Sequence, residues 1–192
     1  QFLLIESASN AAATPSKSSA SAPDIQCHKT AEGYTVSGEQ FEAQWNTQTG
    51  SLISYRSDGT NWITAGGLPS FWRAPVDNDY GAGTPERYAE WKHPEKPGSA
   101  LAFEVIDLQK NAVTFRFTQP LLNGDAVFIQ TVHVNGRGVV EFENVLQTLE
   151  GSAVPDLNRW SAPLKEHQHA NLYRFGNRFT LHPALSQTQW YG

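Results

Sequence analysis

Residues 127–145 read VFIQTVHVNGRGVVEFENV, and this stretch decides the fold. Two runs rich in Val, Ile, Phe and Thr, residues 127–134 and 139–145, stand on either side of Asn135-Gly136-Arg137-Gly138. β-Branched and aromatic residues favour a pleated, half-buried strand, and a short connection that contains Asn and Gly favours a hairpin. The stretch therefore predicts two antiparallel strands joined by a turn.

The same kind of pattern extends outward along the chain. Apolar residues alternate with polar ones, the period of a half-buried strand, at Val113, Phe115 and Phe117 and again at Phe41, Ala43 and Trp45. Residues 52–56 follow as a further predicted strand. Turn dipeptides that favour positive φ separate such runs: Thr49-Gly50, Asp58-Gly59, Asn123-Gly124 and Asn135-Gly136. No run of ten or more residues carries a helical stripe, so we predict an all-β fold, an antiparallel β-sandwich.

Composition and charge exclude several classes of protein. The 192 residues carry a net charge of −5, with a sequence pI near 5.6, so nucleic acid is not an expected partner. No apolar run approaches the roughly 20 residues that cross a bilayer, and we expect no membrane partner. The single cysteine, Cys27, excludes an internal disulfide and a multi-cysteine zinc site. The compartment stays open between cytoplasm and periplasm.

The chain divides into three parts by composition. Residues 1–6 are strand-like, and residues 7–23 consist almost entirely of Ala, Ser, Pro, Thr and Asn. Such a segment has little to bury, so we interpret it as a linker without regular structure. Residues 24–192 form the predicted sandwich domain. Because the sequence contains no methionine, even at position 1, we expect the chain to be part of a longer polypeptide.

The densest polar cluster is FWRAPVDNDYG, residues 71–81. Asp77, Asn78 and Asp79 could bind sugar hydroxyls, and the two carboxylates could also form an acid/base pair. Alternatively, these residues cap a tight loop and Arg73 pins it through a bidentate salt bridge. The segment from residue 77 to residue 97 lacks strand periodicity but includes large aromatic residues such as Trp91, and such long loops are often functional.

Two further patterns have weaker chemical meaning. His167 and His169, next to Glu166, have the spacing of metal ligands on one strand face, but no third ligand is evident, and we predict no metal site. The tryptophans could stack on sugars, although aromatic side chains mostly pack in the core of a sandwich. The six positions are Trp45, Trp62, Trp72, Trp91, Trp160 and Trp190.

Residues 71–81 closely resemble the RAP-x-DND-x-G signature of the C-terminal small-chain domain of glycoside hydrolase family 2 β-galactosidases. Residues 39–55 are similar to an earlier motif of that domain and residues 172–176 to a later one, and Trp190-Tyr191-Gly192 is similar to its WYGxGP motif. Residues 1–4 resemble the last strand of the preceding immunoglobulin-like domain. Tyr173 departs from the family pattern, which has proline there. From the resemblance we expect the chain to carry only the N-terminal part of the domain.

The resemblance implies a galactose-mutarotase-like supersandwich, here truncated, that packs on the catalytic barrel of a β-galactosidase. The family hydrolyses β-galactosides with retention, using two glutamates of the barrel. This chain would then be a non-catalytic accessory domain with no catalytic residue. It would lend a loop, beginning near Gly81, to the active-site mouth. The expected substrate-proximal residues are Asp77, Asn78, Asp79, Gly81 and Trp91, and Arg73 is the expected structural clamp.

The resemblance also implies the partners and cofactors. The partners would be the barrel of the same polypeptide and, through the parent enzyme, a β-galactoside. No cofactor is expected in this chain, since any Mg²⁺ or Na⁺ of the parent would bind in the barrel. Two other functions stay open: a free-standing carbohydrate-binding module, and a mutarotase-like epimerase that uses His167 or His169 with Glu166.

Overall fold

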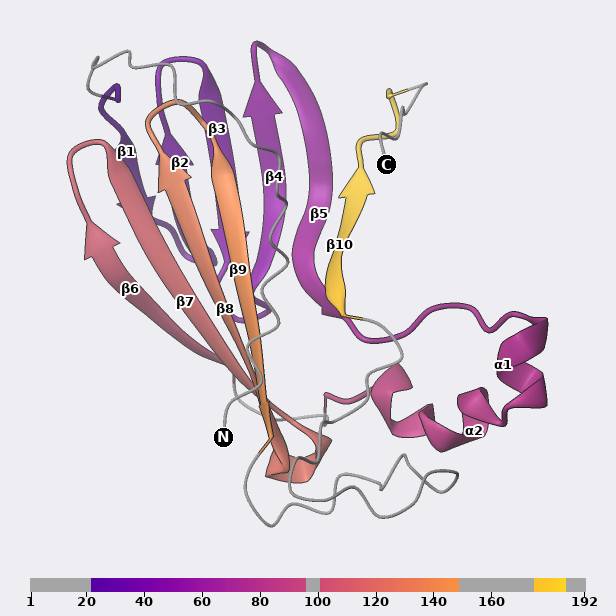
Figure 1. Cartoon of the computed structure of the whole chain (residues 1–192). Helices are drawn as coiled ribbons and strands as arrows, with labels where there is room; N and C mark the ends of the chain where they lie inside the picture. Colours follow the sequence, from indigo (N-terminus) through magenta and orange to yellow (C-terminus); the bar gives the residue numbers. More distant parts are fainter. Residues whose placement is uncertain (1–21, 96–100, 149–174, 186–192) are drawn as a thin grey trace, which may run out of the picture.

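A computed structural model describes residues 22–95, 101–148 and 175–185, which form two antiparallel sheets packed face to face (Figure 1). The six-stranded sheet has the order β1-β2-β3-β4-β5-β10. Its strands are β1 (Gln26–Lys29), β2 (Gly33–Ser37), β3 (Phe41–Asn46), β4 (Ser51–Ser57), β5 (Thr60–Ser70) and β10 (Gly176–Leu181). The four-stranded sheet consists of β6 (Ala102–Leu108), β7 (Ala112–Leu121), β8 (Ala126–Asn135) and β9 (Val140–Thr148), in that order. The predicted antiparallel β-sandwich is confirmed.

The core between the sheets is formed by the alternating residues that the sequence singled out. Phe41, Ala43 and Trp45 of β3 are buried, and so are Val113, Phe115 and Phe117 of β7. The Trp45 and Phe115 rings meet across the sandwich, with their centroids 5.4 Å apart. Each large side chain buried in this way contributes roughly 1.5–3 kcal/mol relative to exposure, so these two strands hold the layers together.

The hairpin of residues 127–145 is confirmed, but its turn differs from the prediction. Val134 of β8 pairs with Val140 of β9, so the connection is longer than a two-residue turn. The positive φ lies at Gly138 (79°), not at Asn135-Gly136. Asn135 stabilises the loop through its side-chain oxygen, which accepts hydrogen bonds from the backbone nitrogens of Arg137 and Val139 at 2.9 and 3.3 Å. Because the loop also contains Arg137 and Gly138, the residue with a left-handed backbone conformation is Gly138 and not a residue of the Asn135-Gly136 pair.

Two other predicted turns do use positive φ at the dipeptide. Asp58 and Gly59, between β4 and β5, have φ of 49° and 76°. Asn123 and Gly124, in the short 3₁₀ turn η2 (Leu122–Gly124) between β7 and β8, have φ of 62° and 102°. These hairpins follow the expected turn chemistry.

β10 joins the six-stranded sheet from far along the chain. It pairs with β5, so that Gly176 lies opposite Ser70 and Leu181 opposite Ile63. Every other strand pair in the described residues connects neighbours in sequence. β5, the longest of these strands, was not expected from the sequence because it contains Gly66, Gly67 and Pro69, which are poor strand formers.

Between β5 and β6 the chain leaves the sandwich and forms short helices beside the lower end of the sheets (Figure 1). These are α1 (Asp77–Gly81), α2 (Thr84–Arg87) and the 3₁₀ helix η1 (Ala89–Lys92). Helices of four or five residues are too short to show a helical period, which is why the sequence indicated only a loop. In the described parts of the chain, no helix has the length and hydropathy needed to cross a membrane.

Several predictions fall outside the described residues. The strand-like residues 1–6 and nearly all of the proposed linker 7–23 lie there, as do Glu166, His167, His169 and Tyr173.

Candidate functional site

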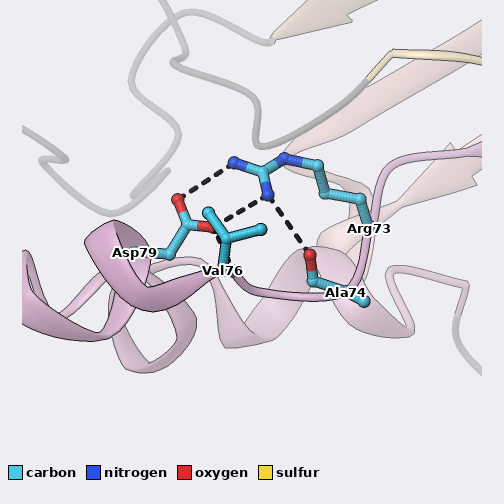
Figure 2. Close-up of polar contacts among 4 residues, drawn as sticks. All are labelled: Arg73, Ala74, Val76 and Asp79. Carbon is cyan, nitrogen blue, oxygen red and sulfur yellow. Dashed lines mark hydrogen bonds and ion pairs between the residues drawn. The ribbon is translucent and has the colours of Figure 1, made fainter.

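The segment from Phe71 to Gly81 is built around one ion pair, between Arg73 and Asp79 (Figure 2). The two guanidinium nitrogens of Arg73 donate to the two carboxylate oxygens of Asp79 at 2.8 and 2.9 Å. One of them, Nη1, also donates to the backbone oxygen of Ala74 at 3.2 Å. The Asp79 side chain is 13% exposed and that of Arg73 is 39% exposed. This two-pronged geometry is the strong form of an arginine–carboxylate contact.

Asp79 also caps the helix to which it belongs. Its carboxylate accepts a hydrogen bond from the backbone nitrogen of Val76 at 2.7 Å, just before α1 begins. The backbone nitrogen of Asp79 in turn donates to the Val76 oxygen at 2.8 Å. Acidic groups in a first turn satisfy free N–H groups and oppose the positive end of the helix dipole. One carboxylate therefore connects the approach to α1, through Arg73, with the first turn of α1.

The other polar residues of the cluster face solvent. Asp77 and Asn78 lie in the first turn of α1 and are exposed. Val76 and Tyr80 are apolar and yet 54% and 62% exposed. Gly81, at the end of α1, is exposed too, and a Cβ there would meet no described atom within 4 Å. Of the three polar residues 77–79, only Asp79 is partly buried, and the other two face solvent.

Trp91, the fifth expected site residue, lies in the interior. It is 1% exposed and packs in a second core cluster at one end of the four-stranded sheet, against Phe71 at a ring-centroid distance of 5.3 Å. The other members of the cluster are Leu121, Ala126, Phe128 and Leu146. No face of this indole is open to a sugar, so its burial favours a packing role. The cluster fixes both ends of the helical segment to the sandwich, since Phe71 precedes α1 and Trp91 lies in η1.

Two weaker contacts support the same arrangement. The ammonium of Lys92 lies 5.9 Å from the centre of the Trp72 ring, within the range of a cation–π interaction. The Phe175 ring stacks on Phe71 at 5.9 Å with an interplanar angle of 23°. Phe71 and Phe175 were not singled out in the sequence as site residues. Their only signal was that each is an aromatic residue within a family-like motif, residues 71–81 and 172–176.

Of the four tryptophans in the described residues, Trp45 and Trp91 are core residues and Trp72 is half-buried. Trp62 of β5 is 44% exposed. Trp160 and Trp190 lie outside the described residues. The expectation that tryptophans mainly pack is met by Trp45 and Trp91.

The electrostatics of the described residues show few perturbed groups. Partial burial raises the pKa of the Cys27 thiol. Partial burial, and secondly the charge of Asp58, raise the pKa of Tyr55. Within residues 22–95, 101–148 and 175–185, no group of three or more His, Cys, Asp and Glu side chains could hold a metal ion.

Comparison with known proteins decides the family. The family model described as beta-galactosidase small chain matches residues 37–192, which include the whole Arg73–Asp79 segment. The chain belongs to the β-galactosidase small-chain family.

The small-chain domain is also similar to part of two much longer proteins named beta-galactosidase. It is 36% identical over 181 residues to a beta-galactosidase of Priestia megaterium (strain DSM 319 / IMG 1521), covering 94% of this chain but 16% of that protein. It is 27% identical over 107 residues to a beta-galactosidase of Clostridium acetobutylicum, covering 55% of this chain and 12% of that protein. The chain therefore spans less than a fifth of the length of these relatives.

Proposed function

We propose that this small-chain domain is a non-catalytic accessory domain of a β-galactosidase. The observation that carries the proposal is the match of residues 37–192 to the small-chain family, joined to the internal ion pair of its most distinctive segment. The enzymes that resemble the chain are named beta-galactosidases, so the parent would hydrolyse terminal β-galactosides.

The contacts of the aspartates support an accessory role over a catalytic one. Glycoside hydrolysis needs two carboxyl groups free to exchange a proton or attack a sugar, about 5–10 Å apart. Both oxygens of Asp79 already accept hydrogen bonds from Arg73, and one also accepts from Val76. A carboxylate engaged in this way is poorly suited to act as acid, base or nucleophile. Its contacts suit a clamp that holds the start of α1.

The helical segment would act at the boundary with the rest of the parent enzyme. It stands beside the sandwich, held at both ends by the second core cluster (Figure 1). Its exposed surface combines apolar Val76 and Tyr80 with polar Asp77 and Asn78. Such a mixed surface fits contact with a catalytic barrel, and loops at an active-site mouth can exclude water once substrate binds. Any Mg²⁺ or Na⁺ of the parent would bind in that barrel.

Steady-state kinetics of the full-length parent enzyme test the proposal. Asn78→Ala, on the exposed side of α1, should change KM or kcat for a chromogenic β-galactoside by severalfold without changing thermal stability. Glu141→Ala is the matched control, because Glu141 is an exposed residue of β9 and far from α1 in sequence. Equal kinetics for Asn78→Ala, Glu141→Ala and the unmodified enzyme would argue against a role at the active-site mouth. The isolated chain should not hydrolyse the substrate, and turnover by the purified chain would overturn the accessory role.

A further inference from the structure

A polar residue, Gln130, lies inside the sandwich where apolar residues are expected. It occupies the inward-facing series of β8, between Phe128 and Val132, and is 2% exposed. A buried amide is costly unless its hydrogen-bonding groups find partners. The partners of Gln130 therefore show why an amide stands at this position.

The side-chain nitrogen of Gln130 points at three oxygens from three other strands. It lies 2.7 Å from the backbone oxygen of Gly67 in β5, 2.9 Å from the side-chain oxygen of Asn144 in β9 and 3.1 Å from that of Asn177 in β10. Because a backbone carbonyl can only accept, Gly67 fixes which end of the Gln130 amide is the donor. The NH₂ group in turn requires Asn144 and Asn177 to present their oxygens.

Gly67 needs this partner because β5 is irregular there. Its φ is 72°, and it has no opposite residue in the register with β4 or with β10. A Cβ at Gly67 would lie 2.7 Å from the ring of Phe142, so only glycine fits this close approach to β9. Its carbonyl accepts a hydrogen bond across the sandwich from the amide of Gln130. The amide therefore ties the irregular point of β5 to the facing sheet.

The bend lies just before the Arg73–Asp79 segment. β5 ends at Ser70, and the chain then runs to α1 (Figure 1). Phe71 and Arg73 lie on this connection, and Arg73 pairs with Asp79 of α1. In the register of the two strands, Asn177 of β10 lies opposite Pro69 of β5. Asn177 also follows Phe175 by two residues, and the Phe175 ring stacks on that of Phe71. The amide of Gln130 therefore makes hydrogen bonds to β5, which precedes Phe71, and to β10, which follows Phe175.

We infer that Gln130 is a positioning residue for the proposed active-site loop: its amide fixes the bend of β5 at Gly67 and, through it, the direction in which the chain enters the Arg73–Asp79 segment. The effect on catalysis rests on the proposed function, whereas the effect on the segment does not.

Hydrogen exchange in the full-length parent enzyme tests the effect on the segment. Gln130→Leu removes both donors at similar volume and leaves three acceptors without them. We expect the backbone amides of Val76 and Asp79 to exchange about tenfold faster, which corresponds to the loss of one such bond. Val134→Ala is the control, since it weakens the same face of β8 without touching the amide. If Val134→Ala accelerates these two amides as much as Gln130→Leu does, the inference is overturned.

Two more variants keep the test decisive if Gln130→Leu does not fold. Asn177→Ala removes one half-buried acceptor, and a smaller acceleration of the same amides is expected. Gln130→Glu places a carboxyl group among three acceptors, which raises its pKa above the ordinary value of about 4.3. A protonated carboxyl supplies one of the two lost donors, so one bond is kept at low pH and is lost as pH rises through the raised pKa. Exchange that matches the unmodified enzyme at every pH would overturn the inference.

Kinetics separate this inference from the proposed function. Gln130→Leu should raise KM for a β-galactoside about tenfold, and Gln130→Glu should raise it increasingly with pH. If exchange accelerates but KM stays unchanged in these variants and in Asn78→Ala, the positioning of the segment stands and the proposed function fails. If KM responds to Asn78→Ala but neither KM nor exchange responds to the Gln130 variants, the proposed function stands and the inference fails.

Discussion

Arg73 and Asp79 meet through two parallel hydrogen bonds, although the helix that contains Asp79 begins only after Arg73. The same carboxylate accepts the backbone N–H of Val76. Three functions of the local chain thus converge on one side chain: a salt bridge, a helix cap and a change of direction out of the sandwich. Removing either partner would leave the other half-buried charge without its main counterpart.

We expect Arg73→Ala to lower the free energy of unfolding by about 1–2 kcal/mol, because Asp79 loses two charge-assisted hydrogen bonds. Arg73→Lys should recover little of it, since an ammonium cannot form the two-pronged contact. Urea denaturation measures both. Arg116→Ala is the control, because its ion pair with Glu104 is exposed and 4.0 Å long and should contribute below about 0.5 kcal/mol. Unchanged stability with abolished catalysis in the parent would identify Arg73 as a true site residue.

Gly81 and Gly83 should respond oppositely to alanine. Gly81 has space for a Cβ and no positive φ, so Gly81→Ala should leave the melting temperature unchanged or slightly raised. Gly83 has a φ of 64°, so Gly83→Ala should cost roughly 1–2 kcal/mol. In the parent enzyme we expect Gly81→Ala to alter KM or kcat, because it stiffens the end of α1. If KM and kcat change only in the variant whose melting temperature falls, Gly81 has no functional role of its own.

Trp91→Ala should destabilise the domain by about 3–5 kcal/mol, the usual loss for a large buried aromatic. Trp91→Phe should cost much less, because the indole nitrogen has no hydrogen-bond partner among the described residues and its removal relieves that deficit. Trp62→Ala, at an exposed ring, should cost below about 1 kcal/mol. Chemical denaturation separates the three. A Trp91→Phe variant with unchanged stability and a raised KM would restore Trp91 as a sugar-contacting residue.

Tyr55 should make stability depend on alkaline pH. Its hydroxyl donates to the backbone oxygen of Gly138 at 2.7 Å, across the two sheets, and its pKa is raised by burial and by Asp58. Because the folded pKa lies above the unfolded value of about 10, the contribution is complete below pH 10 and is lost as pH rises through the folded pKa. Tyr55→Phe should lower stability by about 1 kcal/mol at pH 7 and flatten this alkaline loss. Parallel unfolding curves from pH 7 to pH 11 check it.

Much of the sandwich could be predicted from the sequence, because a strand that is buried on one face alternates apolar and polar residues. Phe115 in β7 and Trp45 in β3 were identified on that basis. β5 escaped detection because Gly66 and Gly67 are determined by close approach to Phe179 and Phe142, residues far along the chain. An ion pair between Arg73 and one of the two aspartates was expected from their charges. That the partner is Asp79 and not Asp77 depends on the geometry of α1, and a helix of five residues is too short to show a helical period in the sequence. Gln130 gave no signal either, since its partners come from three separate strands.

The pairing of β10 with β5 has a consequence for how the chain is made. For example, the side-chain hydroxyl of Thr64 in β5 donates a hydrogen bond to the backbone oxygen of Thr180 in β10, 116 positions along the chain. Every other strand pair in the described residues joins strands that are consecutive in sequence. Hairpins close within microseconds, but ribosomes add roughly 5–20 residues per second. β5 therefore waits as an open edge for about 5–20 seconds before β10 emerges. Glycines and proline weaken an edge as a template for foreign strands, so we expect the residues that hid β5 from sequence-based prediction also to protect the nascent chain from aggregation.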